Sequence, residues 1–86
     1  MNNKKGNRPV LSVGDIVKST AGRGCGRLYL VVEKVDDEYV RICDGRSRKI
    51  ENPKLKKNMH LLPVGKVDID TAALYDAEIR NLLKEV

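Results

Sequence analysis

The chain of 86 residues carries 17 Lys and Arg against 12 Asp and Glu, which gives a formal net charge of +5. This length allows one small domain and leaves little room for a deep substrate cleft. Trp and Phe are absent and Tyr occurs three times, so the composition excludes a binding surface built from paired aromatic rings. The positive charge favours a polyanionic partner, although it would also serve solubility alone.

Polar and basic residues fill the start of the chain, and we interpret residues 1–9 as a flexible basic arm. The chain then becomes β-like, and we assign residues 10–66 to a single β domain. Segments rich in β-branched and apolar residues predict five strands, over residues 13–19, 27–35, 39–43, 46–50 and 59–62. Asp44-Gly45 is a favoured hairpin turn. Pro53 interrupts the sheet pattern, so residues 51–58 are predicted to be a basic loop.

The apolar period changes near the C-terminus. There, large apolar residues recur at helical spacing, at Tyr75, Ile79, Leu82 and Val86. Residues 67–86 are therefore predicted to form a C-terminal helical segment with Asp70 as its N-cap. Asp76 and Arg80 have the spacing of a favourable helical ion pair.

The predicted strand over residues 27–35 is apolar on both faces. Leu28, Leu30 and Val32 alternate with Tyr29 and Val31, and an open small sheet would leave one of these faces in water. We therefore expect a mainly β fold in which closure into a five-stranded barrel buries the first face. One C-terminal α-helix is expected to cover the second face, although its apolar stripe could instead serve self-association.

Charge is distributed unevenly along the chain. Residues 1–66 hold 15 basic and 7 acidic groups, a net charge of +8, whereas residues 67–86 hold 2 basic and 5 acidic groups, a net charge of −3. The basic character thus belongs to the strand region, and the helix is not expected to face phosphate.

A glycine-rich loop connects the first two predicted strands. Gly22, Gly24 and Gly26 stand at alternate positions beside Arg23 and Arg27. Glycines expose backbone N–H groups, and the forked guanidinium donors of arginine suit phosphate oxygens. The alternative is that the glycines only supply the turn geometry of the hairpin.

The stretch from residue 13 to 32 resembles the KOW motif, a short hairpin module of ribosomal proteins and transcription elongation factors. Gly14-Asp15, Gly22 and Gly26 match its pattern, whereas Cys25 stands where the motif usually has a basic residue. Over residues 10–62 the chain resembles small bacterial KOW-domain RNA-binding proteins, which are related to eukaryotic-type large-subunit ribosomal proteins of the fourteen-e and six-e kind. The resemblance implies an SH3-like barrel and an RNA partner, with ribosomal RNA the leading candidate.

A second group of cations lies further along the chain, at Arg41, Arg46, Arg48, Lys49, Lys54, Lys56 and Lys57. Within residues 41–58 only Asp44 and Glu51 oppose them. Such a run is either a solvated face or a set of phosphate contacts. Together with Gly22, Arg23, Gly24, Gly26 and Arg27, these cations form the predicted RNA-binding site. Tyr29 or Tyr39 would assist on a splayed base if exposed.

No catalytic group or cofactor site stands out. His60, Cys25 and Cys43 lack the close pairs typical of structural zinc sites, so no metal is predicted. Cys25 is a candidate redox-sensitive thiol, and Cys43 is expected to be a buried hydrophobe. The apolar run from Leu28 to Val32 is too short to span a bilayer.

The sequence therefore predicts a non-enzymatic, cytoplasmic RNA-binding protein that is monomeric and associated with ribosomes or translation. The alternative is an adaptor barrel that docks another protein of the transcription or translation machinery.

Overall fold

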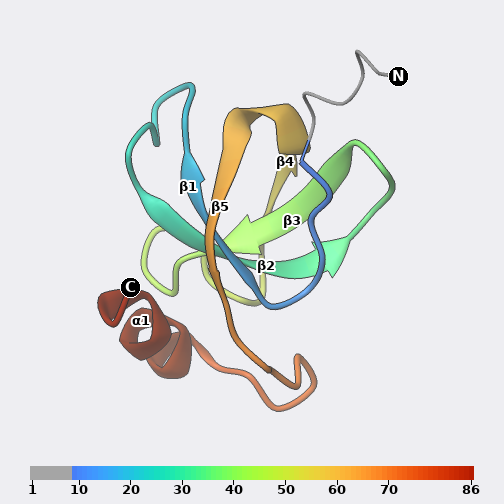
Figure 1. Cartoon of the computed structure of the whole chain (residues 1–86). Coiled ribbons are helices and arrows are strands. Elements are labelled where there is room, and N and C mark those ends of the chain that lie inside the picture. Colours follow the sequence, from blue (N-terminus) through green and yellow to red (C-terminus); the bar gives the residue numbers. More distant parts are fainter. Residues whose placement is uncertain (1–8) are drawn as a thin grey trace.

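The computed structural model describes residues 9–86, so the predicted basic arm, apart from Pro9, lies outside the described residues. Five strands form one antiparallel sheet in the order β4-β3-β2-β1-β5, and a single helix follows them (Figure 1). The elements are β1 (Asp15–Ser19), β2 (Leu28–Lys34), β3 (Tyr39–Cys43), β4 (Lys54–Lys57), β5 (Leu61–Lys66) and α1 (Asp76–Lys84). The prediction of a mainly β fold with five strands and a C-terminal helix is confirmed.

The sheet curls round on itself (Figure 1). Its two edge strands, β4 and β5, are consecutive in the chain and are joined by the short 3-10 helix η2 (Asn58–His60). Within residues 9–86 no ladder pairs β4 with β5. The sheet is therefore rolled, and hydrogen bonds between its edges do not close it.

Strand β2 has an apolar core on each of its faces, as its sequence predicted. One core consists of buried side chains enclosed by the rolled sheet, namely Leu11, Val17, Tyr29, Val31, Val40, Ile42 and Leu61. The second core lies between the sheet and α1, and it consists of Ile16, Leu30, Val32, Cys43 and Ile79. The assignment of the faces was wrong, because the helix covers Leu30 and Val32, and the sheet encloses Tyr29 and Val31.

The fourth strand lies at Lys54–Lys57, and the prediction of a strand over residues 46–50 and a loop over residues 51–58 was wrong. Residues 44–50 form a loop instead, because the Asp44 carboxylate organises their backbone. Its Oδ1 accepts hydrogen bonds from the N–H groups of Arg46 and Arg48, each at 2.9 Å. Pro53 stands directly before β4, a position where its missing N–H costs no ladder hydrogen bond.

The fifth strand continues through Pro63 and Gly65, which were expected to end it. Strand β5 is an edge strand, where proline is tolerated. Its pairing with β1 shifts register between Ile16, opposite Gly65, and Val17, opposite Pro63. This bulge accommodates the extra residue Val64. The predicted start at residue 59 was also too early, since Asn58–His60 form η2.

Helix α1 begins at Asp76, later than the predicted N-cap at Asp70. Asp70 instead closes a turn, with its Oδ1 accepting from Ala72 N–H at 3.1 Å. Asp76 and Arg80 bond the backbone of loop 44–50, and residues 9–86 contain no ion pair between them. No helix among the described residues has the length and apolar character needed to cross a bilayer.

We predict that the two thiols differ sharply in reactivity. Cys25 is exposed and Cys43 is buried. Burial raises the pKa of the Cys43 thiol to about 12, and the carboxylates of Asp76 and Asp44 act in the same direction. A thiol-specific reagent at pH 8 should modify Cys25 quickly and Cys43 only after denaturation, as measured by mass spectrometry. Equal rates in the native protein would contradict this burial.

The same pKa shift has a consequence for stability. The folded protein favours the neutral Cys43 thiol, so this contribution is full below pH 9.0, the ordinary pKa, and is lost as the pH rises towards about 12. The stability difference between the wild type and Cys43→Ala should shrink over that range.

Candidate nucleic-acid interface

The glycine-rich loop between β1 and β2 is held by its own backbone. Gly26 N–H donates to Ser19 O at 2.7 Å, and Arg27 N–H donates to Gly24 O at 2.9 Å. Gly22 and Gly26 have φ angles of +81° and +89°, which residues with a side chain rarely adopt. Gly22 and Gly26 therefore supply the turn geometry of the hairpin, which was the alternative role considered for the glycines of this loop.

Three successive N–H groups at the tip of this loop have no internal partner. Within residues 9–86, the N–H groups of Gly22, Arg23 and Gly24 donate no hydrogen bond. Arg23 is exposed, and its guanidinium adds further donors beside them. The tip thus presents donors suited to an anionic oxygen.

Gly24 is required for a different reason, which is the close approach of a ring. A Cβ atom at this position would collide with the hydroxyl group of Tyr29. Tyr29 is only 7% exposed, so it supports the loop from below and cannot stack on a base. Tyr39 is partly buried, and the Lys57 ammonium lies 5.9 Å from the centre of its ring. Tyr29 therefore does not meet the condition of exposure on which its stacking role depended.

The loop and the second basic segment meet in one surface hollow of about 220 Å³, which we call the loop hollow. It is lined by Arg23, Gly24, Arg27, Tyr29, Ser47, Arg48 and Lys54. Four of these side chains are cations and none is a carboxylate. Two groups of cations that are separate in the sequence thus converge on one site.

Lys56 joins the same two segments without lining the loop hollow. Its Nζ donates to Ala21 O at 3.3 Å and would lie 3.6 Å from a Cβ atom at Gly22. This contact anchors the glycine-rich loop to β4, so Lys56 acts on the site through the loop.

Three other cations of the predicted site lie elsewhere. Arg41 Nε lies 3.2 Å from Glu33 Oε1 across the β2–β3 pair. Lys57 lies over Tyr39, and Lys49 is exposed without lining the loop hollow. The structure therefore separates these three residues from the converging set.

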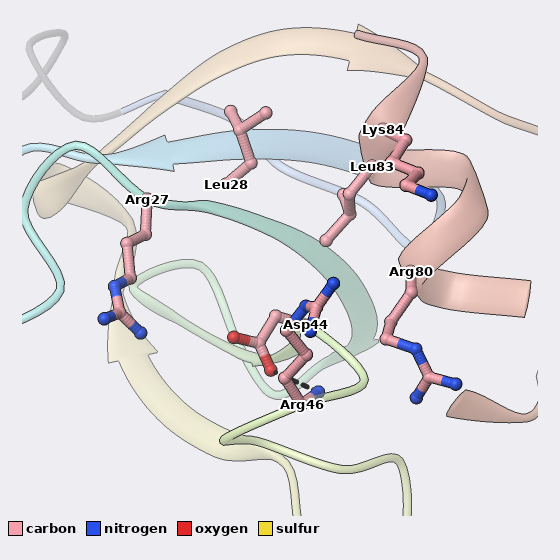
Figure 2. Close-up of a pocket in the computed structure, with 7 residues that line it drawn as sticks. All are labelled: Arg27, Leu28, Asp44, Arg46, Arg80, Leu83 and Lys84. Carbon is pink, nitrogen blue, oxygen red and sulfur yellow. Dashed lines mark hydrogen bonds between the residues drawn. The ribbon is translucent and has the colours of Figure 1, made fainter. Parts of the chain in front are cut away.

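Arg46 and Arg27 line a second, larger hollow of about 410 Å³, which we call the helix hollow (Figure 2). Its remaining lining residues are Leu28, Asp44, Arg80, Leu83 and Lys84. Arg27 lines both hollows, so the two are neighbours on one continuous basic surface.

The sequence analysis missed Arg80 and Lys84 because it averaged charge over residues 67–86. On the folded helix the charges separate. Arg80 and Lys84 face the helix hollow, whereas Glu78 lines another hollow together with Asp68 and Asp70. The spacing of four residues between Arg80 and Lys84 places them on one helix face, and this signal could have identified them.

Comparisons of the chain with models of known protein families and with curated proteins found no match. Among residues 9–86 no group of three or more His, Cys, Asp or Glu side chains could hold a metal ion. The arrangement that the structure does show is a basic surface with two hollows, formed by loop 20–27, loop 44–50, Lys54 of β4 and the Arg80 and Lys84 side of α1.

We predict that Gly45 is the glycine on which the helix side of this surface depends. Its φ is +77°, and an added Cβ would lie 2.5 Å from Asp76 O and 3.0 Å from Arg80 Cγ. Gly26→Ala is the matched control, because Gly26 has a similar φ but open space around it. Positive φ costs an L-residue about 1–2 kcal/mol, and overpacking adds about 1–3 kcal/mol.

Gly45→Ala should therefore lower the free energy of unfolding in urea by more than Gly26→Ala does. Similar losses for the two variants would show that α1 does not press on loop 44–50.

Proposed function

We propose that this protein is a non-enzymatic RNA-binding protein that holds the phosphate backbone of RNA in the loop hollow and on the basic surface around it. The observation that carries this proposal is the loop hollow itself, where Arg23, Arg27, Arg48 and Lys54 converge and no carboxylate lines the site. Cations gathered in this way repel one another unless a polyanion lies near them.

Binding begins with electrostatic capture. Arginine forks and the free N–H groups of residues 22–24 then hold phosphate oxygens directly. Contacts of this kind position a nucleic acid without reading its sequence. The scarcity of aromatic residues and the burial of Tyr29 agree with a grip on the backbone.

The resemblance of residues 13–32 to the KOW motif supports RNA as the polyanion. On this basis we also propose a cytoplasmic, monomeric protein that binds ribosomal or other structured RNA in the setting of translation. Purification with and without nuclease separates this function from that of a protein adaptor. Loss of co-eluting absorbance at 260 nm supports RNA, and retention of a defined protein partner after nuclease treatment contradicts it.

We predict a steep dependence of RNA affinity on salt. If about five phosphates are neutralised, log K should fall with log salt with a slope of about −3.5 to −4.5, because binding releases condensed counterions. The slope is measured by fluorescence anisotropy with a labelled structured RNA in about 50 to 300 mM KCl. This is roughly the range of salt concentration over which phosphate contacts weaken. An affinity independent of salt would overturn the mechanism.

We predict that Arg23→Ala with Arg27→Ala weakens RNA binding and reduces the magnitude of the salt slope by about 1 to 2, because two phosphate contacts are lost. The circular dichroism spectrum should not change, since both side chains are exposed. Lys34→Ala with Lys57→Ala is the matched control, since it removes the same charge away from both hollows. Equal loss of affinity in the two variants would show that only net charge matters, and an altered spectrum with unchanged affinity would make the loop arginines structural.

A further inference from the structure

Asp44 is the one acidic residue among those that line the helix hollow, and only one of its two carboxylate oxygens accepts hydrogen bonds. The residue is 8% exposed, and its Oδ1 holds the N–H groups of Arg46 and Arg48. Within residues 9–86 its Oδ2 accepts no hydrogen bond and joins no ion pair. Figure 2 shows this second oxygen turned away from the bond to Arg46, towards the side where Arg27 lies. Asn58 Oδ1 is the one buried side-chain oxygen or nitrogen of the described residues without a hydrogen-bond partner, so Asp44 Oδ2 reaches the surface of the hollow and offers a carboxylate acceptor to a ligand there.

The other lining groups of the helix hollow are of two kinds. Leu28 and Leu83 supply apolar surface, and Leu83 points into the space between the cations (Figure 2). Arg27, Arg46, Arg80 and Lys84 supply positive charge, and none of them forms an ion pair in the part of the chain that the structure describes. Arg80 also donates to Gly45 O at 2.7 Å, which holds one wall of the hollow in place.

The helix hollow thus combines apolar leucine surface, a carboxylate acceptor and several cations. A ligand that matches these three features has an apolar face, a hydrogen-bond donor on its edge and an attached anion. A nucleotide has this combination, since its base can lie on the leucine side chains while its phosphates meet the cations. The volume of about 410 Å³ falls within the range of small-molecule sites. We propose that the helix hollow takes one unpaired nucleotide of the bound RNA, and that Asp44 Oδ2 selects a base with an exocyclic amino group, such as cytosine, over uracil.

This proposal rests on the proposed RNA-binding function and adds base selection to it. Arg27 lines both hollows, so a strand whose phosphates lie in the loop hollow can continue directly into the helix hollow. Carboxylate side chains accept hydrogen bonds from the N4 amino group of cytosine. Uracil presents a carbonyl oxygen at that position, which the Asp44 carboxylate repels.

The test compares two single-stranded RNA 12-mers, one of cytidine and one of uridine, at the same salt concentration and pH 7.5. The wild-type protein should bind the cytidine oligomer about tenfold more tightly, which corresponds to one hydrogen bond to a charged group. Equal affinities with a preserved salt slope would overturn the base selection and leave the proposed function intact. If neither RNA binds in a salt-dependent way, the proposed function itself fails.

Asp44→Asn sharpens the test. The asparagine Oδ1 can still accept from Arg46 and Arg48, but an amide donor replaces the free acceptor, so the preference should move towards uridine. Asp36→Asn is the matched control, because Asp36 Oδ1 likewise accepts two backbone N–H groups, at 2.8 Å each, on an exposed turn outside both hollows. This control should raise affinity for both oligomers equally. A cytidine preference unchanged in Asp44→Asn would contradict the role of Asp44.

A measurement on the unmodified protein covers the case in which Asp44→Asn does not fold. The methyl signals of Leu28 and Leu83 should shift in NMR spectra when the cytidine oligomer is added, because a base lies against them. Methyl signals that stay unchanged under saturating RNA would place the nucleotide elsewhere and overturn the proposal.

Discussion

The burial of β2 on both faces is the constraint on which the rest of the structure depends. A single sheet can cover only one face of a strand by curling round it, and here it encloses Tyr29 and Val31. The other face, with Leu30 and Val32, needs a separate cover, and Ile79 of α1 provides it. Burying a large aliphatic side chain stabilises a fold by about 1.5–3 kcal/mol, so the helix is held where β2 is most apolar. This position puts α1 next to loop 44–50 and completes the helix hollow.

Polar contacts then set the exact relation of α1 to that loop. Arg80 donates to Gly45 O, and Asp76 accepts from Ile50 N–H at 2.8 Å. The absence of a side chain at Gly45 allows the helix backbone to approach this closely. Both ends of loop 44–50 are hydrogen-bonded to the same helix. The position of the loop, and with it the position of its cations, is therefore fixed relative to α1. A ligand that neutralises these charges would stabilise the folded protein as it binds.

The sequence predicted the parts of the fold that local pattern determines. The two-sided apolar character of β2 was visible in its alternation, and β1 and β3 matched their predicted ranges closely. Strand β4 was missed because Lys54, Lys56 and Lys57 have low β-propensity, and its extended form comes from pairing with β3. The start of α1 was missed because Asp70, a good N-cap residue, also closes turns. The face that the helix covers depends on the direction in which the sheet rolls, which no local pattern encodes.

The candidate site likewise has residues that the local sequence identifies and residues that only the tertiary structure brings to it. Loop arginines beside glycines are recognisable in the sequence, and Arg23 and Arg27 do line the loop hollow. Whether a cation further along the chain joins them depends on whether the fold gives it another partner. Arg41, for example, forms an ion pair with Glu33 instead. Net charge over a segment hides the answer, since Arg80 and Lys84 line the helix hollow whereas Glu78 of the same helix lines another hollow. Asp44 shows the same effect at a single residue. The sequence predicts a turn there, and once α1 is packed Asp44 is the only acidic residue among the described residues that line the helix hollow.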